Sequence, residues 1–236
     1  MLIASVARPC LGSPRATAKE ALEREGYAVV RNFFSTEEIA WMRGEVTATL
    51  ARIARRAHNG GLLCTPKRHE SRLASRLLDD AQLANHWGGE LPDTVEFQAD
   101  TVHDWHVDMD IEPRTDAALL RIASGRMYKI AIHLQDHADR DGLSVIPGSH
   151  RDGNTRRAPL HLSTRAGDIV IFDLRIRHAG RLLNRTDDLM ATIAWRLHRL
   201  HLVDDAGRHK VFRWLRHTFQ QKPAAERLAI FLEMRN

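Results

Sequence analysis

The side chains most able to do chemistry are concentrated in residues 101–110, TVHDWHVDMD. His106 and Asp108 are two positions apart, so on an extended strand both side chains point to the same face. From one face, an imidazole and a carboxylate can bind the same metal ion. The other interpretation of this segment is a solvated acidic loop.

The His-x-Asp spacing is too common in this chain to identify a metal site by itself. It occurs at His106/Asp108, His137/Asp139 and His150/Asp152. Composition alone predicts about one such pair by chance. The neighbouring sequence must therefore decide which pair, if any, binds a metal.

A third ligand candidate is His178, which ends the apolar run DIVIFDLRIRH at residues 168–178. If the run is a single strand, alternation places His178 on its inward face. The other residues of that face are Val170, Phe172, Leu174 and Ile176. A histidine there suits either a core residue held by a hydrogen bond or a metal ligand. Two histidines and one carboxylate form the facial triad of non-haem Fe(II) oxygenases, and His106, Asp108 and His178 supply that set.

Two helices are predicted near the N-terminus. Residues 15–25 carry helix formers and stop at Gly26. Residues 35–57 begin with Ser35 and have Glu38 three positions later, which is the pattern of a capping box. Apolar residues then recur at helical spacing, which predicts an amphipathic helix of about six turns.

Most of the remaining chain has the spacing of strands. Alternating or apolar runs bounded by turn-forming residues cover 27–34, 94–107, 126–137, 143–149 and 168–178. The tail, residues 211–236, returns to helical spacing with a break near Pro223. Helices followed by strands predict an α+β fold with a mainly β core, built as an antiparallel sandwich or barrel.

The length and composition indicate an ordinary globular protein. A chain of 236 residues can bury a full core, and we expect a single domain over residues 1–236. Cys10 and Cys64 are too few for a disulfide framework, which favours a reducing compartment. The N-terminus lacks the pattern of a signal peptide, and no apolar run reaches the ~18 residues of a membrane span. We therefore expect a cytoplasmic protein with no membrane partner.

The net charge of +5 raises the question of a polyanionic partner. The basic residues are dispersed, and none of them forms a motif interleaved with aromatic residues, so nucleic acid is not the predicted partner. The simplest interpretation is a surface on which arginine outnumbers the acids. Among functional interpretations, attraction of a small anionic substrate needs the fewest assumptions.

Four segments occur in the order typical of one enzyme family. They are GYAVVRNFFSTEEIAWMR, WHVD, HLQDHADRDGLSVIPGSHR and GDIVIFDLRIRHAGRLLN. With them the chain resembles the phytanoyl-CoA dioxygenase family of Fe(II)/2-oxoglutarate oxygenases, over about Ala16 to Arg196. The combination is specific, although each segment alone is weak evidence.

The resemblance selects the first His-x-Asp pair, because His106 and Asp108 fall in the family's metal-binding WHxD. It implies that His106, Asp108 and His178 hold Fe(II), with 2-oxoglutarate and O2 as co-substrates. The implied reaction is hydroxylation of a small-molecule substrate with release of succinate and CO2. Halogenating relatives replace the carboxylate, so its presence in this chain favours hydroxylation. The implied fold is a double-stranded β-helix, or jelly-roll (cupin-like) barrel, flanked by N- and C-terminal helices.

One position departs from the family pattern. The family holds the distal carboxylate of 2-oxoglutarate with an Arg at the start of the strand after the distal His, and alignment places Met190 there. We expect Lys129, on a predicted strand, or Arg185, on the preceding turn, to replace that cation, unless Lys129 extends to the surface. The alternatives are a metal-dependent oxidase that does not use 2-oxoglutarate, and a non-catalytic binding barrel.

Overall fold

The computed structural model describes residues 14–56, 61–80, 83, 94–99, 108, 127–137, 142–152, 157–180, 185–204, 207, 210–211, 214–215 and 227–235. The helices are α1 (Pro14–Glu25), α2 (Thr36–Ile53), η1 (Arg68–Glu70, a 3-10 helix), α3 (Arg72–Leu78), α6 (Ser149–Asp152) and α7 (Arg185–Arg199). The strands are β1 (Tyr27–Val30), β2 (Arg55–Arg56), β3 (Leu62–Cys64), β4 (Thr94–Ala99), β5 (Met127–His133), β6 (Ser144–Val145), β7 (Leu160–His161), β8 (Ile169–Asp173), β9 (His178–Ala179) and β10 (Leu228–Arg235).

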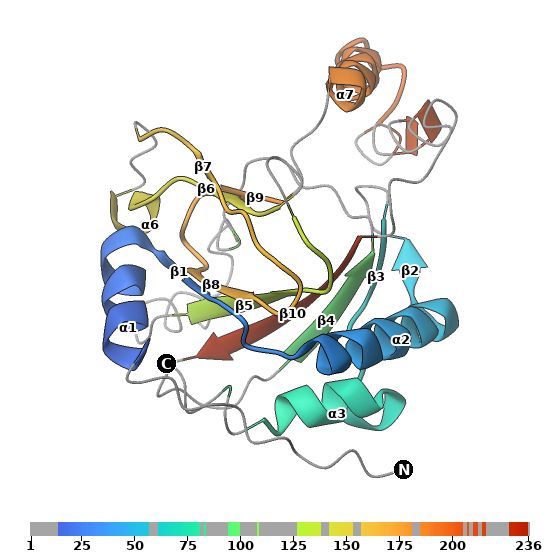
Figure 1. Ribbon diagram of the computed structural model, residues 1–236. Helices are drawn as coiled ribbons and strands as arrows, with labels where there is room; N and C mark the ends of the chain where they lie inside the picture. The colour runs from blue at the N-terminus through green and yellow to red at the C-terminus, as the bar shows by residue number, and fades with distance from the viewer. Residues whose placement is uncertain are drawn as a thin grey trace, which may run out of the picture.

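These strands form two antiparallel sheets that lie one above the other (Figure 1). The larger sheet has the order β1-β8-β5-β10-β4-β3-β2, and the smaller has the order β7-β6-β9. Within the described ranges the sheets do not close into a barrel. The predicted combination of helices with an antiparallel β core is therefore confirmed.

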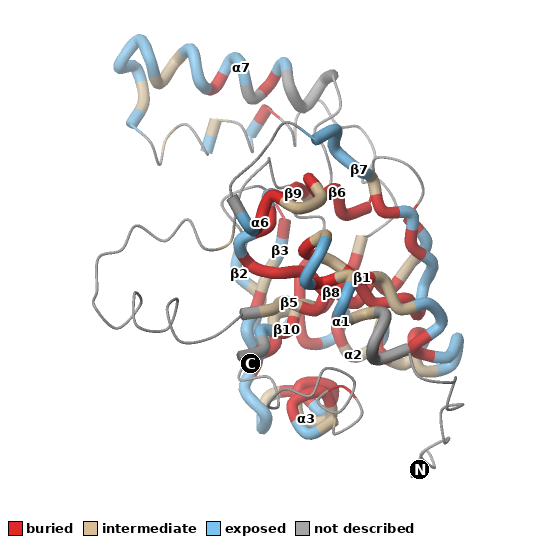
Figure 2. The backbone as a smooth tube through the Cα atoms, turned by 90° about the vertical axis from the view of Figure 1, so that its left-hand side faces the viewer, coloured by how far each residue is buried: buried red, intermediate tan, exposed pale blue. Residues whose placement is uncertain are grey.

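Alternation along the strands gives the larger sheet two different faces. Its outer face packs against α1, α2 and α3 through residues such as Ile130, Ile132 and Ile171. Its inner face carries Ala131, Val170 and Phe172, which pack against residues of the smaller sheet and its connections. Those partners are Leu143, Val145, Leu162 and Ile176. Figure 2 shows buried segments in both sheets.

The two N-terminal helices form as predicted. Gly26 ends α1 with a φ of 83°, a conformation that glycine adopts without strain. α2 begins with the predicted capping box, in which Ser35 and Glu38 satisfy each other's backbone amides. The helix ends at Ile53 rather than at residue 57, because Arg55 and Arg56 pair with β3 instead.

The prediction of a helix is wrong for the end of the tail, because residues 228–235 form β10 in the middle of the larger sheet, whereas the described residues Val211, Trp214 and Leu215 before Pro223 are helical. β10 pairs with β4 on one side and with β5 on the other. A central strand is buried on both faces, so its sequence, LAIFLEMR, is almost continuously apolar and does not alternate clearly. A short run of this kind has the same composition in a buried helix and in a buried strand.

The prediction of one strand over residues 168–178 is also wrong. β8 ends at Asp173, whose carboxylate accepts a hydrogen bond from the backbone of Arg175, and the amide of Ile176 donates to the carbonyl of Asp173. These bonds close a turn, and the chain then enters the smaller sheet as β9. His178 therefore begins a strand in the second sheet instead of ending a strand in the first.

The segment after Asn184 forms the helix α7. The alignment that placed Met190 at the position of the family's arginine had assumed a strand there. Its apolar residues recur every three or four positions, as in a helix. Met190 is only 3% exposed and lies on the packed side of α7. In Figures 1 and 2, α7 lies apart from the two sheets. No helix in the described part of the chain is long and apolar enough to cross a membrane.

Two glycines should respond in opposite ways to replacement by alanine. Gly167 has a φ of 96°, and an added β-carbon would meet the carbonyl oxygen of Phe34. We expect Gly167→Ala to lower the free energy of unfolding by about 1–3 kcal/mol. Gly44 lies inside α2 with open space around it, so Gly44→Ala should raise that free energy by about 0.5–1 kcal/mol. Urea titration measures both values, and similar changes in the two variants would contradict the backbone argument.

Candidate metal centre

Asp108 and His178 come together between the two sheets, although seventy positions separate them. The Nε2 atom of His178 lies 3.7 Å from Oδ1 of Asp108. His178 is 5% exposed, and its ring packs against that of Phe172 with 4.7 Å between the centroids. The pair therefore lies at the edge of the apolar cluster between the sheets.

The turn between β8 and β9 holds both side chains in place. Its Leu174 carbonyl accepts a hydrogen bond of 3.1 Å from the backbone amide of Asp108. Its Ile176 carbonyl lies 3.0 Å from Nδ1 of His178. Because a carbonyl can only accept, Nδ1 donates to it, and Nε2 is the ring nitrogen that faces Asp108. A metal-binding histidine is typically oriented in this way by a backbone carbonyl.

Lys129 points into the same region from β5. Its Nζ lies 3.0 Å from Oδ2 of Asp108 and 3.8 Å from Oε1 of Glu233, and it also lies 5.3 Å from the centroid of the Phe231 ring. Burial by itself lowers the pKa of this ammonium, but the surrounding carboxylates, Asp108 foremost, raise the pKa above its ordinary value. Lys129 therefore stays charged at neutral pH and does not extend freely into solvent.

The remaining predicted site residues cannot be placed at this centre from the structure. His106 lies outside the described residues, and Arg185 begins α7 at a position where the side chain is not described. Within the described ranges, no group of three or more His, Cys, Asp and Glu side chains is close enough together to hold a metal. Asp108 and His178 are thus two of the three predicted ligands, and their donor types suit iron.

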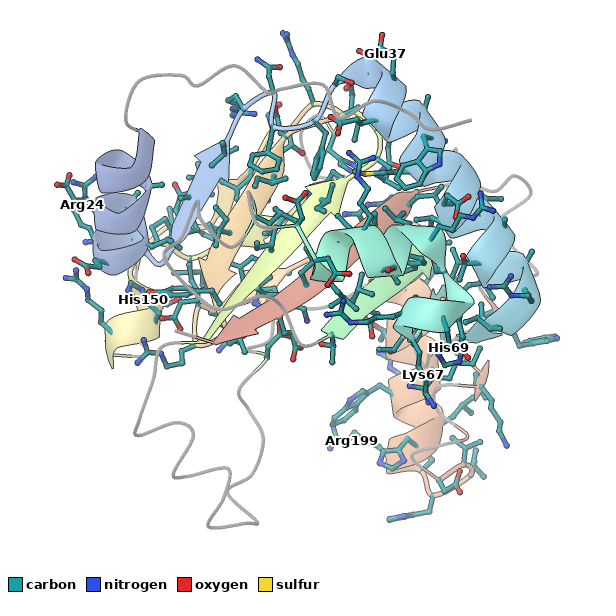
Figure 3. The ribbon with its side chains drawn as sticks, turned by 90° about the horizontal axis from the view of Figure 1, so that it is seen from below. Arg24, Glu37, Lys67, His69, His150 and Arg199 are labelled. Atoms are coloured by element: carbon teal, nitrogen blue, oxygen red, sulfur yellow. The ribbon has the colours of Figure 1, made fainter. Side chains whose placement is uncertain are left out.

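The two competing His-x-Asp pairs lie elsewhere. Nε2 of His150 is 3.3 Å from the carbonyl oxygen of Glu23, and Figure 3 shows His150 beside α1 and α6. Nε2 of His137 is 2.6 Å from the side-chain amide of Gln135. Asp139 lies outside the described residues, and the side chain of Asp152 is not described. The carboxylate of Asp108 contacts Lys129 and His178, and its backbone amide donates to the carbonyl of Leu174.

Sequence reasoning missed Arg227, which immediately precedes β10. Among the described strands, β10 is the next along the chain after β9, so Arg227 is the arginine at the start of the strand that follows the distal histidine. By alternation it shares the inner face with Ala229 and Phe231. Gln135 fixes the neighbouring Leu228 by accepting from its amide at 2.9 Å and donating to its carbonyl at 3.0 Å. An arginine directly before the last apolar run of the sequence could have indicated this position. That run was predicted to be a helix, so the arginine was not considered.

Residues 54–190, more than half of the chain, match the model of the phytanoyl-CoA dioxygenase (PhyH) family. The chain belongs to the phytanoyl-CoA dioxygenase family. It is therefore an oxygenase that depends on Fe(II) and 2-oxoglutarate and uses O2. The matched region contains His106, Asp108 and His178, and it ends before Arg227.

Solved structures of similar fold include three proteins of low sequence identity. EctD from S. alaskensis, in its apoform, has a TM-score of 0.63 at 18% identity over 93% of this chain and 76% of that one. The epimerase SnoN, in complex with Fe3+, α-ketoglutarate and nogalamycin RO, has a TM-score of 0.60 at 16% identity over 93% and 82%. HygX from Streptomyces hygroscopicus, with nickel and 2-oxoglutarate bound, has a TM-score of 0.59 at 11% identity over 92% and 85%. At these identities the likeness establishes the fold. The chain has no significant match to a curated protein.

Two buried histidines, His178 in the predicted ligand set and His150 outside it, allow a matched test of the ligand assignment. Loss of a residue that only hydrogen-bonds to a metal ligand typically weakens metal binding by ~10- to 100-fold. We expect His178→Ala to weaken Mn(II) binding by more than that, because it removes a ligand itself. His150→Ala should leave Mn(II) affinity unchanged. Calorimetric titration with Mn(II) measures both, with thermal unfolding as the check on folding. Equal affinities in the two variants would move the metal site away from His178.

Proposed function

We propose that this family member binds Fe(II) through His106, Asp108 and His178 and hydroxylates a small-molecule substrate, with release of succinate and CO2. The observation that carries the proposal is the Asp108–His178 pair, in which Nε2 of His178 lies 3.7 Å from the carboxylate. Iron held there supplies the activation of O2 when 2-oxoglutarate is bound. The presence of a carboxylate at position 108, rather than a small residue, favours hydroxylation over halogenation.

We propose that the two facing sheets are the two walls of a double-stranded β-helix. The order β1-β8-β5-β10-β4 opposite β7-β6-β9 supports this interpretation, as does the apolar cluster that fills the space between them. Val170, Phe172 and Ile176 are each fully buried in that cluster. Their role in the reaction is to keep water away from one side of the metal ligands.

The far carboxylate of 2-oxoglutarate is proposed to pair with Arg227. Two observations support this assignment over the predicted Lys129. The ammonium of Lys129 is already placed at Asp108, so it lies at the metal end of the site. Arg227 lies at the opposite end of the inner face, because β10 runs antiparallel to β5 and its first residues pair with the end of β5. A guanidinium can hold a carboxylate through two parallel hydrogen bonds.

Lys129 is proposed to act on the orientation of Asp108. Its ammonium holds Oδ2, while Oδ1 faces His178. A carboxylate fixed in this way presents one oxygen to the metal. The charge of Lys129 also offsets part of the charge of Asp108 in a region of low dielectric, where an unpaired carboxylate is costly.

The substrate is proposed to be a small molecule. Two relatives of the same fold were crystallised with small molecules, nogalamycin RO in SnoN and hygromycin B in HygX. The net charge of +5 favours an anionic compound, since long-range attraction raises the rate of encounter.

The direct test is conversion of 2-oxoglutarate to succinate by the purified protein with Fe(II) and O2. The assay measures succinate directly, and it is run with and without candidate small-molecule substrates. Succinate formation that depends on added Fe(II) and is absent in Asp108→Ala supports the proposal. A protein that binds Fe(II) but forms no succinate, with or without candidate substrates, contradicts it.

The proposed cation can be identified by comparing two matched variants. Arg227→Met should raise the apparent KM for 2-oxoglutarate by about tenfold or more, equivalent to ~1.4 kcal/mol of lost binding. Lys129→Met should raise that KM less and should alter metal affinity instead, since Lys129 contacts Asp108. Arg185→Met should leave both quantities unchanged. The reverse ranking of Arg227 and Lys129 would restore the assignment made from the sequence.

A further inference from the structure

His133, the last residue of β5, is a buried polar side chain whose surroundings suggest a ligand. It is 1% exposed. Neither of its ring nitrogens has a hydrogen-bond partner among the residues that the structure describes. Buried polar groups in folded proteins are nearly always hydrogen-bonded, because an unpaired one has lost its water without compensation. An imidazole in this position is therefore expected to bind something polar.

The ring points into the space between the sheets. Lys129, Ala131 and His133 alternate along β5 on one face, and Ala131 belongs to the apolar cluster between the sheets. Ala229 lies opposite His133 on β10, and Ala131 is its nearest neighbour on the same face of β5. Both neighbouring side chains are therefore alanines. Small neighbours leave room beside the imidazole for part of a ligand.

The imidazole is uncharged and lies near a fixed positive charge. Burial, followed by the neighbouring His137 and Arg227, lowers the pKa of His133 well below its ordinary value. Arg227 is two residues before Ala229, the partner of His133 on β10, and by alternation it lies on the same face of the sheet. A neutral imidazole carries one N–H donor, and beside a guanidinium that donor is suited to an anion.

A second buried donor lies close to this group. Thr164 is 1% exposed, and its hydroxyl has no hydrogen-bond partner within the described ranges. Its backbone pairs with that of His137, and the rings of His137 and His133 are 4.6 Å apart between centroids. Unsatisfied donors thus gather at the end of the inner face that is remote from Asp108.

The separation between this group and the metal ligands suits a ligand with two charged ends. His133 is four residues from Lys129, about 13 Å along the strand from Cα to Cα. Lys129 contacts Asp108, so a molecule bound to the metal at that end and lying past Ala131 would extend toward His133.

We propose that His133 donates a hydrogen bond to the far carboxylate of 2-oxoglutarate, beside Arg227, and so selects a dicarboxylate over a monocarboxylic 2-oxo acid. This inference rests on the proposed function. Arg227 supplies the charge, and His133 supplies a directional donor that adds no second charge to the pocket. A methyl group in place of the far carboxylate would leave the donor of His133 unpaired.

The test compares two acids that differ only at the far end. 2-Oxovalerate has the 2-oxo acid group of 2-oxoglutarate but ends in a methyl group. Calorimetry of both acids with the Mn(II)-loaded full chain measures binding without turnover. The variants are His133→Leu, which removes both ring nitrogens, and His133→Gln, which restores a donor. His150→Leu is the matched control, since His150 is also buried but bonds to Glu23 outside this space.

The expected result is selective. His133→Leu should weaken 2-oxoglutarate binding about tenfold, as for loss of a hydrogen bond to a charged group, and should leave 2-oxovalerate binding unchanged. His133→Gln should recover part of the loss, and His150→Leu should change neither affinity. Without ligand, His133→Leu should not lower the Tm, because it removes polar atoms that have no partner in the part of the chain that the structure describes.

Three results would overturn the inference. Equal losses for both acids would mean that His133 supports the metal site or the fold and does not contact the far carboxylate. Unchanged 2-oxoglutarate binding in both His133 variants would mean that the imidazole binds only water, and the proposed function would stand. Failure of the unsubstituted Mn(II)-loaded protein to bind 2-oxoglutarate would overturn the proposed function together with this inference.

Discussion

The candidate site depends on the turn that carries the chain from one sheet to the other between Asp173 and His178. Two of its carbonyls hold the backbone of Asp108 and the ring of His178, so a single turn sets the position of both metal-ligand candidates. Asp173, almost completely buried, fixes the turn by accepting from the backbone and side chain of Arg175. On the other side, the amide of Arg177 donates to Ser149. Buried hydrogen bonds of this kind give the site its rigidity.

The second constraint is the cost of placing charge between two apolar layers. The larger sheet presents aliphatic residues to the helices on one face and a smaller apolar cluster to the other sheet. Charged groups enter that inner space at both ends, with Lys129 paired to Asp108 at one end and Arg227 near a neutral His133 at the other. Opposite charges are compensated at the metal end, whereas at the remote end the imidazole of His133 and the hydroxyl of Thr164 have no hydrogen-bond partner among the described residues. The two ends of the space between the sheets therefore differ in charge and in hydrogen-bonding groups, which suits an elongated anionic co-substrate.

Local patterns predicted the N-terminal helices, the capping box of α2 and the strand that carries Lys129, because each depends on neighbours in sequence. The family's motifs indicated Asp108 and His178, and the structure brings these two together. Three features were beyond local reasoning. The turn after Asp173 depends on a buried carboxylate, and β10 is recognisable only from its two neighbouring strands. The helical segment α7 separates β9 from β10, so the alignment stopped at Met190 and did not reach Arg227, which immediately precedes β10.

The most direct test of the central claim is anomalous diffraction from crystals of the full chain grown with Mn(II) in place of Fe(II). The account predicts one strong anomalous peak in contact with the Asp108 carboxylate, Nε2 of His178 and the imidazole of His106. A peak on His150 or His137 with none at Asp108 would contradict it, and so would Asp108 and Lys129 remaining paired with no metal bound at saturating Mn(II).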